Sequence, residues 1–132
     1  MTTAEVVNEY LRRLDQRDAD GVGELFADEI DWFVPGHSEL PWTGRRSRRA
    51  EVPEYLNTLW PHFEPGKSTA TLEKVLIDDE NAAIFLVFEH TVARTGRSFR
   101  TPVAMRLQVK EGRIVTMHLF EDTATVSNAF FD

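Results

Sequence analysis

Two titratable side chains, His90 and Glu121, lie in stretches of sequence that otherwise alternate apolar residues, so they could exchange protons with a bound molecule. Imidazole gains or loses its proton near neutral pH. A carboxylate in an apolar pocket has its proton affinity raised by desolvation. The pair could act as acid and base across one pocket, or the carboxylate could orient the imidazole. The alternatives are a hydrogen-bonded core histidine and a solvated glutamate at a strand end.

Other kinds of site find little support in the composition. The chain has no cysteine, so it has no disulfide framework, thiolate zinc site or cysteine nucleophile. Its four histidines lack the spacing of metal ligands, and its seven glycines form no phosphate-binding loop. No nucleophilic serine motif is present. We expect no metal, no cofactor and a cytoplasmic location.

The net charge of −7 disfavours nucleic acid as a partner, because phosphate binding needs a cationic surface. The arginines of Arg45–Arg49 are a local exception. They are interpreted either as a solvated loop before a helix or as an anion-binding rim. No apolar run is long enough to span a bilayer, and the early acidic residues of the amphipathic N-terminus are typical of a helix and not of a signal peptide. We expect neither nucleic acid nor a membrane as a partner.

The elements that would position these residues follow from the spacing of apolar side chains. A chain of 132 residues fits one domain, residues 1–132. Spacing near 3.6 predicts three helices in the first half, and spacing of two predicts strands around and after them. The helices are expected from a cap at Thr3 through Leu14, after a cap at Asp18 or Asp20, and from Ser47 to Pro61. The strands are expected from Asp28 up to Pro35, Thr69 to Ile77, Ala82 to Arg94, Ser98 to Val109 and Arg113 to Asp122.

Both faces of the predicted sheet carry apolar residues. On the second long strand, Leu86 and Phe88 share one face with His90, while Phe85 and Val87 lie on the other. Three helices can cover only one face. An exposed apolar surface of this size is unusual on a monomer, so we expect a homodimer through the outer sheet face.

Five segments, in this order and spacing, resemble the SnoaL-like branch of the nuclear transport factor 2 (NTF2)-like superfamily. They are Glu24–Glu29, Trp32–Gly36, Pro41–Gly44, Gly112–Met117 and Phe120–Val126. The resemblance covers essentially the whole chain, and the superfamily includes ketosteroid isomerases, limonene-epoxide hydrolase and polyketide cyclases. It implies an α+β fold shaped as a cone, in which three N-terminal helices pack on a strongly curved, mainly antiparallel sheet and enclose a pocket.

The catalytic sets of the two best-known relatives are not retained. Tyr10 falls at the position of the oxyanion-hole tyrosine of ketosteroid isomerases, but Val34 replaces their catalytic base and Met105 their second acid. In place of the polar groups of the epoxide hydrolase stand Trp32, Val34, His90, Val92 and Leu119.

The resemblance implies which side chains face the pocket. The catalytic candidates are His90, Glu121 and Tyr10, the last as a hydrogen-bond donor to a carbonyl oxygen or, alternatively, as a core ring. A shift of one residue in register would exchange Glu121 for Asp122. The ligand-binding candidates are Trp32, Val34, His37, Trp42, Phe88, Val103, Met105, Met117 and Leu119.

From the pocket and its polar groups, we expect a cofactor-free isomerase, cyclase or hydrolase that acts by acid–base chemistry on a small hydrophobic, carbonyl-bearing metabolite. The alternative is a non-catalytic domain that binds a small apolar ligand or serves as a dimeric accessory protein. The loss of the relatives' catalytic sets favours the alternative, whereas the polar groups kept among apolar pocket residues favour the enzyme.

Overall fold

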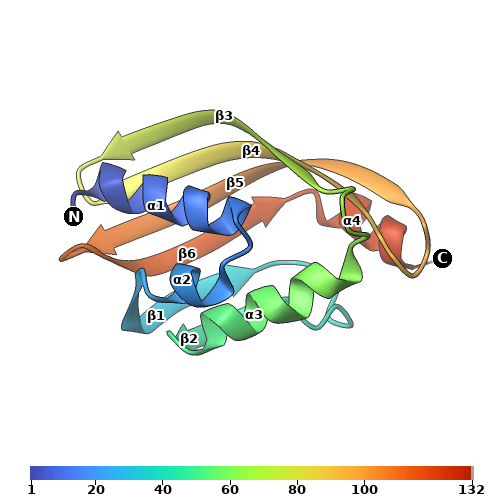
Figure 1. Cartoon of the computed structure of the whole chain (residues 1–132), viewed down its shortest axis with the longest axis horizontal. Helices are drawn as coiled ribbons and strands as arrows, with labels where there is room; N and C mark the ends of the chain where they lie inside the picture. The colour runs from blue at the N-terminus through green and yellow to red at the C-terminus, as the bar shows by residue number, and fades with distance from the viewer. Residues whose placement is uncertain (132) are drawn as a thin grey trace.

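Six strands form one curved sheet, in the order β2-β1-β6-β5-β4-β3, in the computed structural model of the protein, which describes residues 1–131 (Figure 1). Among the strands of residues 1–131, only β1 and β6 pair in parallel, and every other neighbouring pair is antiparallel. The short turns after β3, β4 and β5 explain the antiparallel pairs, because a tight hairpin reverses the chain. The strands are β1 (Phe26–Val34), β2 (Gly44–Arg48), β3 (Thr69–Asp78), β4 (Asn81–Thr91), β5 (Ser98–Lys110) and β6 (Arg113–Glu121).

Three helices from the first half of the chain lie on one side of this sheet, as Figure 1 shows. They are α1 (Thr3–Asp15), α2 (Ala19–Gly23) and α3 (Glu51–Leu59), the last continued by the short 3₁₀ helix η1 (Trp60–His62). The predicted α+β class, with three N-terminal helices on a mainly antiparallel sheet, is confirmed. The sheet does not close on itself, since β2 and β3 are free edges.

Helix α1 is fixed at its start by a capping box. The side chain of Thr2 accepts a hydrogen bond from the backbone N–H of Glu5, whose carboxylate accepts one from the N–H of Thr2. The cap is therefore one residue earlier than the Thr3 that the sequence predicts. The helix buries Tyr10 two turns further on.

The sequence prediction is wrong in two places, at Gly44–Arg48 and after β6. Residues Gly44–Arg48 form the edge strand β2, whereas the sequence predicts that a helix begins at Ser47. The helix begins at Glu51, whose carboxylate accepts hydrogen bonds from the backbone N–H groups of Ser47 and Arg48. After β6 the chain forms a fourth helix, α4 (Thr123–Phe130), which the sequence analysis does not predict.

Asp122 begins this fourth helix and does not belong to the last strand. Its carboxylate accepts hydrogen bonds from the backbone N–H and the hydroxyl of Thr125, and this is the geometry of an N-cap. Thr95 in the loop after β4 donates a hydrogen bond to the carbonyl oxygen of Ala129 at 2.8 Å. These contacts hold α4 against the end of the sheet, to the right in Figure 1.

A row of four buried aromatic rings joins the helices to the sheet. The ring of Tyr10 on α1 lies 6.0 Å from that of Phe26, which lies 5.7 Å from that of Trp32, both on β1. Trp32 in turn contacts Tyr55 on α3, with centroids 4.8 Å apart. Aromatic pairs at these distances and tilts are favourable beyond the area that they bury. The row therefore sets the positions of both tyrosines relative to the sheet.

A bulge in the hairpin of β5 and β6 changes which residues of β6 face inward. Gln108 pairs with Thr116, but Val109 pairs with Ile114, so Val115 is the extra residue. Ile114 is consequently fully buried in the core, whereas strict alternation predicts that it lies on the outer face. From Met117 onward the alternation holds, and Met117, Leu119 and Glu121 share the inner face.

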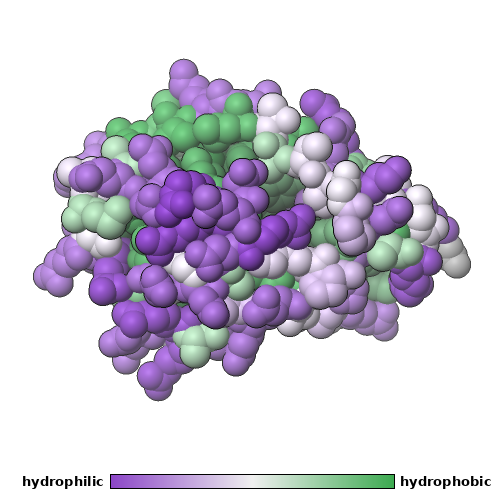
Figure 2. All heavy atoms as spheres, viewed as in Figure 1, coloured by the Kyte–Doolittle hydropathy of each residue, from purple (hydrophilic) through white to green (hydrophobic). Residues whose placement is uncertain are grey.

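Apolar side chains also lie on the outer face of the sheet. Phe85 pairs with Ala104, and Ala104 pairs with Phe120, so three adjacent strands carry one apolar row. Phe85 is 39% exposed and Phe120 is 56% exposed. Hydrophobic atoms also gather at the top of Figure 2, where Figure 1 places the edge strand β3 with its exposed Leu72, Leu76 and Ile77. None of the helices formed by residues 1–131 combines the length and the hydropathy needed to cross a bilayer.

Helices α2 and α3 pack closely where Gly23 meets Pro53, and this contact can be tested by substitution. A Cβ atom added at Gly23 would lie 2.9 Å from Cγ of Pro53, closer than van der Waals contact allows. We expect Gly23→Ala to lower the free energy of unfolding by about 1–3 kcal/mol because of overpacking, measured by urea denaturation. Adding Pro53→Ala to this variant makes room and should recover part of the loss; purely additive effects would contradict the proposed contact.

Candidate functional site

A cavity of about 300 Å³ lies between α1, α3 and the inner face of the sheet. Most of its lining is aliphatic or aromatic, which suits the enclosure of an apolar molecule. Strands β3, β4, β5 and β6 supply the wall on the side of the sheet, and the inner positions of these strands alternate with outer ones. Six residues predicted from the sequence belong to the lining: Tyr10, Phe88, His90, Met105, Met117 and Leu119.

The other predicted ligand-binding residues lie elsewhere. Four of them are buried behind the cavity lining, namely Trp32, Val34, Trp42 and Val103. His37 is exposed in the loop before β2, where its ring packs 4.5 Å from that of Phe131 and its Nδ1 accepts a hydrogen bond from the N–H of Glu39. The structure therefore brings together Tyr10, the predicted residues of β4, Met105 of β5 and the predicted ligand-binding residues of β6, but not those of β1, Val103 of β5 or the loop before β2.

His90 is held as a neutral imidazole at one end of the cavity. Its Nδ1 lies 2.8 Å from the hydroxyl oxygen of Ser68, and its ring stacks on that of Phe63 with centroids 4.0 Å apart. Burial, together with the positive charge of Arg17, lowers the pKa of His90 to about 4. At neutral pH the ring is uncharged and a poor proton acceptor, so it is suited to hydrogen bonding and packing.

Glu121 has the opposite behaviour. Its carboxyl group follows Leu119 on the inner face of β6, but Glu121 is not among the residues that line the cavity. The carboxyl group makes no hydrogen bond or ion pair within residues 1–131. Burial and the nearby charge of Asp122 raise the pKa of Glu121 to about 7. Both protonation states are populated near neutral pH, which is the condition that a general acid or base requires.

His90 and Glu121 do not form a pair. His90 pairs with Phe99 on β5, whereas Glu121 pairs with Val103, four positions further along the same strand. Two strand spacings and four residues of rise separate their backbones by about 16 Å. The group that orients the imidazole is therefore Ser68 and not the carboxylate.

Both tyrosines of the chain line the cavity and keep their protons. Burial raises the pKa of Tyr10, and burial together with the charges of Glu121 and Tyr10 raises the pKa of Tyr55. Neither hydroxyl makes a hydrogen bond within the part of the chain that the structure describes. Both O–H groups are therefore free to donate to an oxygen atom of a ligand.

Tyr55 lines the cavity with a polar group but is not among the candidates selected from the sequence. It belongs to the apolar side of α3, where a phenol ring fits the helical pattern of a core residue. Burial and the charge of Glu121 both raise the pKa of Tyr55, so the electrostatic effect of the carboxyl group on β6 extends to this phenol. The one available signal is its polar atom among the apolar residues of α3, since a buried hydroxyl needs a partner.

The arginines of residues 45–49 point to different partners. Arg45 lies over the ring of Phe33, and Arg46 lies over that of Tyr55 while donating to the carbonyl oxygen of Trp42. Arg49 donates to the carbonyl oxygen of Phe26 and forms an ion pair with Asp28. The guanidinium groups of these three arginines contact different parts of the protein and do not converge on one anion site.

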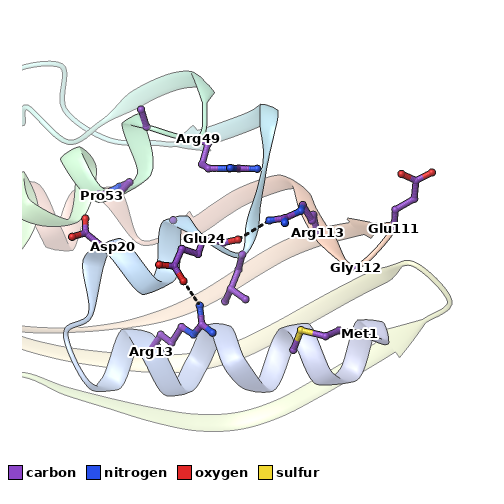
Figure 3. A pocket seen from close by; sticks show the side chains of 12 residues that line it. Met1, Arg13, Asp20, Glu24, Arg49, Pro53, Glu111, Gly112 and Arg113 are labelled. Atoms are coloured by element: carbon purple, nitrogen blue, oxygen red, sulfur yellow. Dashed lines mark hydrogen bonds and ion pairs between the residues drawn. The ribbon is translucent and has the colours of Figure 1, made fainter.

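A larger depression of about 700 Å³ lies at the other end of the molecule and is shown in Figure 3. Arg13 forms an ion pair with Glu24, and Arg113 donates to the carbonyl oxygen of Glu24. Arginine and acidic side chains alternate around it, and its arginines already have partners. It therefore has neither the apolar wall nor the free polar groups of the inner cavity. No group of three or more His, Asp or Glu side chains among residues 1–131 is placed to hold a metal ion.

Comparison with known proteins identifies the architecture. The model of the SnoaL-like domain family matches residues 7–117. The crystal structure of an NTF2-like protein from Burkholderia thailandensis is similar, with a TM-score of 0.88 and 22% identity over 100% of this chain and 99% of that one. A protein with a ketosteroid isomerase-like fold from Catenulispora acidiphila, in complex with trimethylamine, gives a TM-score of 0.79 and 15% identity over 97% and 94%.

TerC, co-crystallised with polyporic acid, gives a TM-score of 0.83 and 16% identity over 96% of each chain. No curated protein sequence matches the chain. At these identities the solved structures establish the fold alone: the NTF2-like cone that the sequence predicts.

The raised pKa of Glu121 makes stability depend on pH. The folded protein holds this proton up to about pH 7, whereas an unfolded glutamate loses it near pH 4.5, so the carboxyl group destabilises the fold as the pH rises through this window. We expect the difference in unfolding free energy between Glu121→Gln and the native protein to grow by about 2 kcal/mol in favour of the variant as the pH rises from about 4.5 to 8. This figure is lower than the full pKa difference gives, because Glu121 is partly exposed. Chemical denaturation across this range measures the difference; a constant difference would contradict the assignment.

Proposed function

Because the chain belongs to the SnoaL-like domain family, we propose that its cavity encloses a small hydrophobic molecule that carries a carbonyl group and changes it by acid–base chemistry without a cofactor. The observation that supports this most strongly is the carboxyl group of Glu121 on the inner face of β6, which has a pKa of about 7 and no partner within residues 1–131. Its charge acts on Tyr55, which lines the cavity and whose hydroxyl makes no hydrogen bond within the same residues. An isomerase, a cyclase and a hydrolase can all use such a set.

The proposed chemistry starts with proton transfer to Glu121. The carboxylate accepts a proton from a carbon atom next to the carbonyl group of the ligand, and negative charge develops on the carbonyl oxygen. The hydroxyl of Tyr55 or Tyr10 donates a hydrogen bond to that oxygen and stabilises the enolate. The protonated Glu121 then returns the proton to a different atom. His90 and Ser68 position the ligand through hydrogen bonds, because the imidazole is neutral.

The second candidate function is binding without conversion. Val34 and Met105 stand where the resemblance to ketosteroid isomerases expects acids, and both are buried hydrophobic side chains here. A cavity of this kind would sequester an apolar molecule. The cytoplasmic location expected from the cysteine-free sequence belongs to the proposal in either case.

Glu121→Gln separates the two functions. Native mass spectrometry after incubation with an extract of apolar metabolites identifies the molecule that the protein retains, and turnover of that molecule is then measured. We expect the variant to retain the molecule but to lose about 100-fold to 10,000-fold in kcat, and the native rate to rise with pH through about 7. Asp122→Asn keeps the cap of α4 and should leave the turnover at high pH within a few-fold of the native value. Because it removes the charge that helps to raise the pKa of Glu121, it should move the rise of the rate to lower pH. Retention of an unchanged molecule by the native protein would favour binding.

We also propose that two copies associate through the outer face of the sheet. The row formed by Phe85, Ala104 and Phe120 is continuous across three strands, and Val87 and Pro102 pair on the next outer level. Two such surfaces related by a two-fold axis would cover each other. No membrane or nucleic acid is part of this proposal, and the net charge of −7 disfavours the latter.

A charged residue in the apolar row should break this dimer. We expect Phe120→Glu to convert a dimer into a folded monomer, because two buried carboxylates would face the partner's apolar surface. Light scattering after size-exclusion chromatography measures the mass. Ile77→Glu is the control, since this exposed residue pairs with Ala82 on the inner face. A native protein that is monomeric at high concentration would contradict the proposal.

A further inference from the structure

Arg17, in the loop between α1 and α2, is the one Lys or Arg residue among those that line the inner cavity. Its guanidinium carbon lies 5.0 Å from the centroid of the Trp60 ring. No hydrogen bond or ion pair of this side chain occurs within residues 1–131. By contrast, Arg13, Arg46 and Arg49 all donate to backbone carbonyl oxygens. Arg17 thus presents a positive charge that an aromatic ring orients and that no protein anion neutralises by contact.

The backbone at Arg17 supports a role for this side chain. The N–H of Arg17 donates to the carbonyl oxygen of Leu14, and the N–H of Asp18 donates to that of Arg13. This is a Schellman motif, and Arg17 occupies the position where glycine is favoured because φ is positive. Its φ is 57°, in the left-handed region. An arginine therefore occupies a position that disfavours any residue with a Cβ atom, as Asp79 and Glu111 do in the hairpin turns, and Arg17 differs from those two in lining a cavity.

The charges along the cavity show which ligand group Arg17 would meet. The imidazole of His90 is close enough to Arg17 for the guanidinium charge to lower its pKa, and it is neutral at neutral pH. The hydroxyl of Ser68 is uncharged. Arg17 and Asp15, which we call the rim, are the Lys, Arg, Asp or Glu residues among those that line the cavity. Asp15 makes no ion pair with Arg17 within the described residues. A ligand anion at this end would meet one cation that is free to pair.

We propose that the cavity binds a hydrophobic molecule with one anionic group, such as a carboxylate, and that Arg17 pairs with this group at the rim. The inference rests on the proposed function of the cavity and adds the substrate class. The apolar part of the molecule lies against Phe88, Met105 and Leu119, while its acid group meets the guanidinium over Trp60. The reacting carbonyl then lies toward Tyr55 and Glu121, at the other end of the site.

Two fluorescent probes of almost equal shape test the proposal. Anilinonaphthalene sulfonate carries one negative charge, whereas phenylnaphthylamine has the same rings and none. We expect the native protein to bind the sulfonate more tightly than the neutral probe. Arg17→Gly should lower the affinity for the sulfonate by about fivefold or more and leave that for the neutral probe unchanged. Because glycine suits the positive φ of this position, the variant should be at least as stable to urea as the native chain.

Two further variants serve as comparisons. Arg45→Ala removes an arginine that also lies over an aromatic ring, but on the outer face, so it should leave both affinities unchanged. Asp15→Asn removes the acid of the rim and should strengthen binding of the sulfonate alone. Equal loss of sulfonate binding in the Arg17 and Arg45 variants, or none in either, would overturn the role of Arg17. Binding of neither probe by the native protein would instead overturn the proposed function of the cavity, and the inference with it.

Discussion

The arrangement of the site depends on the row of aromatic rings formed by Tyr10, Phe26, Trp32 and Tyr55. Helices and sheet each supply two of these rings, so their contact fixes how far α1 and α3 stand from the strands. A curved sheet cannot be covered evenly by straight helices, and the space that remains beside the row is the cavity. The two outer rings of the row are also the two tyrosines, and both tyrosines line the cavity.

Burial then assigns the protonation states. Removing a group from water disfavours its charged form, so it lowers the pKa of an imidazole and raises that of a carboxyl group. For His90 the charge of Arg17 acts in the same direction, and for Glu121 the charge of Asp122 does so. Two residues of similar promise in the sequence consequently have different roles. One is fixed as neutral, and the other titrates close to neutral pH.

The sequence predicts the strands well because a period of two in β4, β5 and β6 reflects their position between a core and an outer face. It predicts the inner face of β6 correctly beyond Met117 but not Ile114, because a bulge adds one residue and period counting assumes none. Strand β2 is missed since Gly44–Arg48 has no apolar alternation: an edge strand with four polar residues in five looks like a loop. The cap at Asp122 is local, yet α4 also depends on contacts with the loop after β4, and these are distant in sequence.

The candidate site shows the same division between local and distant information. Alternation along one strand identifies His90 and Glu121 as inward residues, but their separation depends on the register of two strand pairs, which no single strand reveals. Tyr55 and Arg17 resemble a core residue and a solvated loop residue until the fold sets them on the same cavity. The proposals thus assign anion binding to Arg17 at one end and proton transfer to Glu121 at the other, with apolar cavity residues between them. A molecule that satisfies both ends must be amphipathic and oriented in one direction, and this restricts the ligand more than the apolar wall alone does.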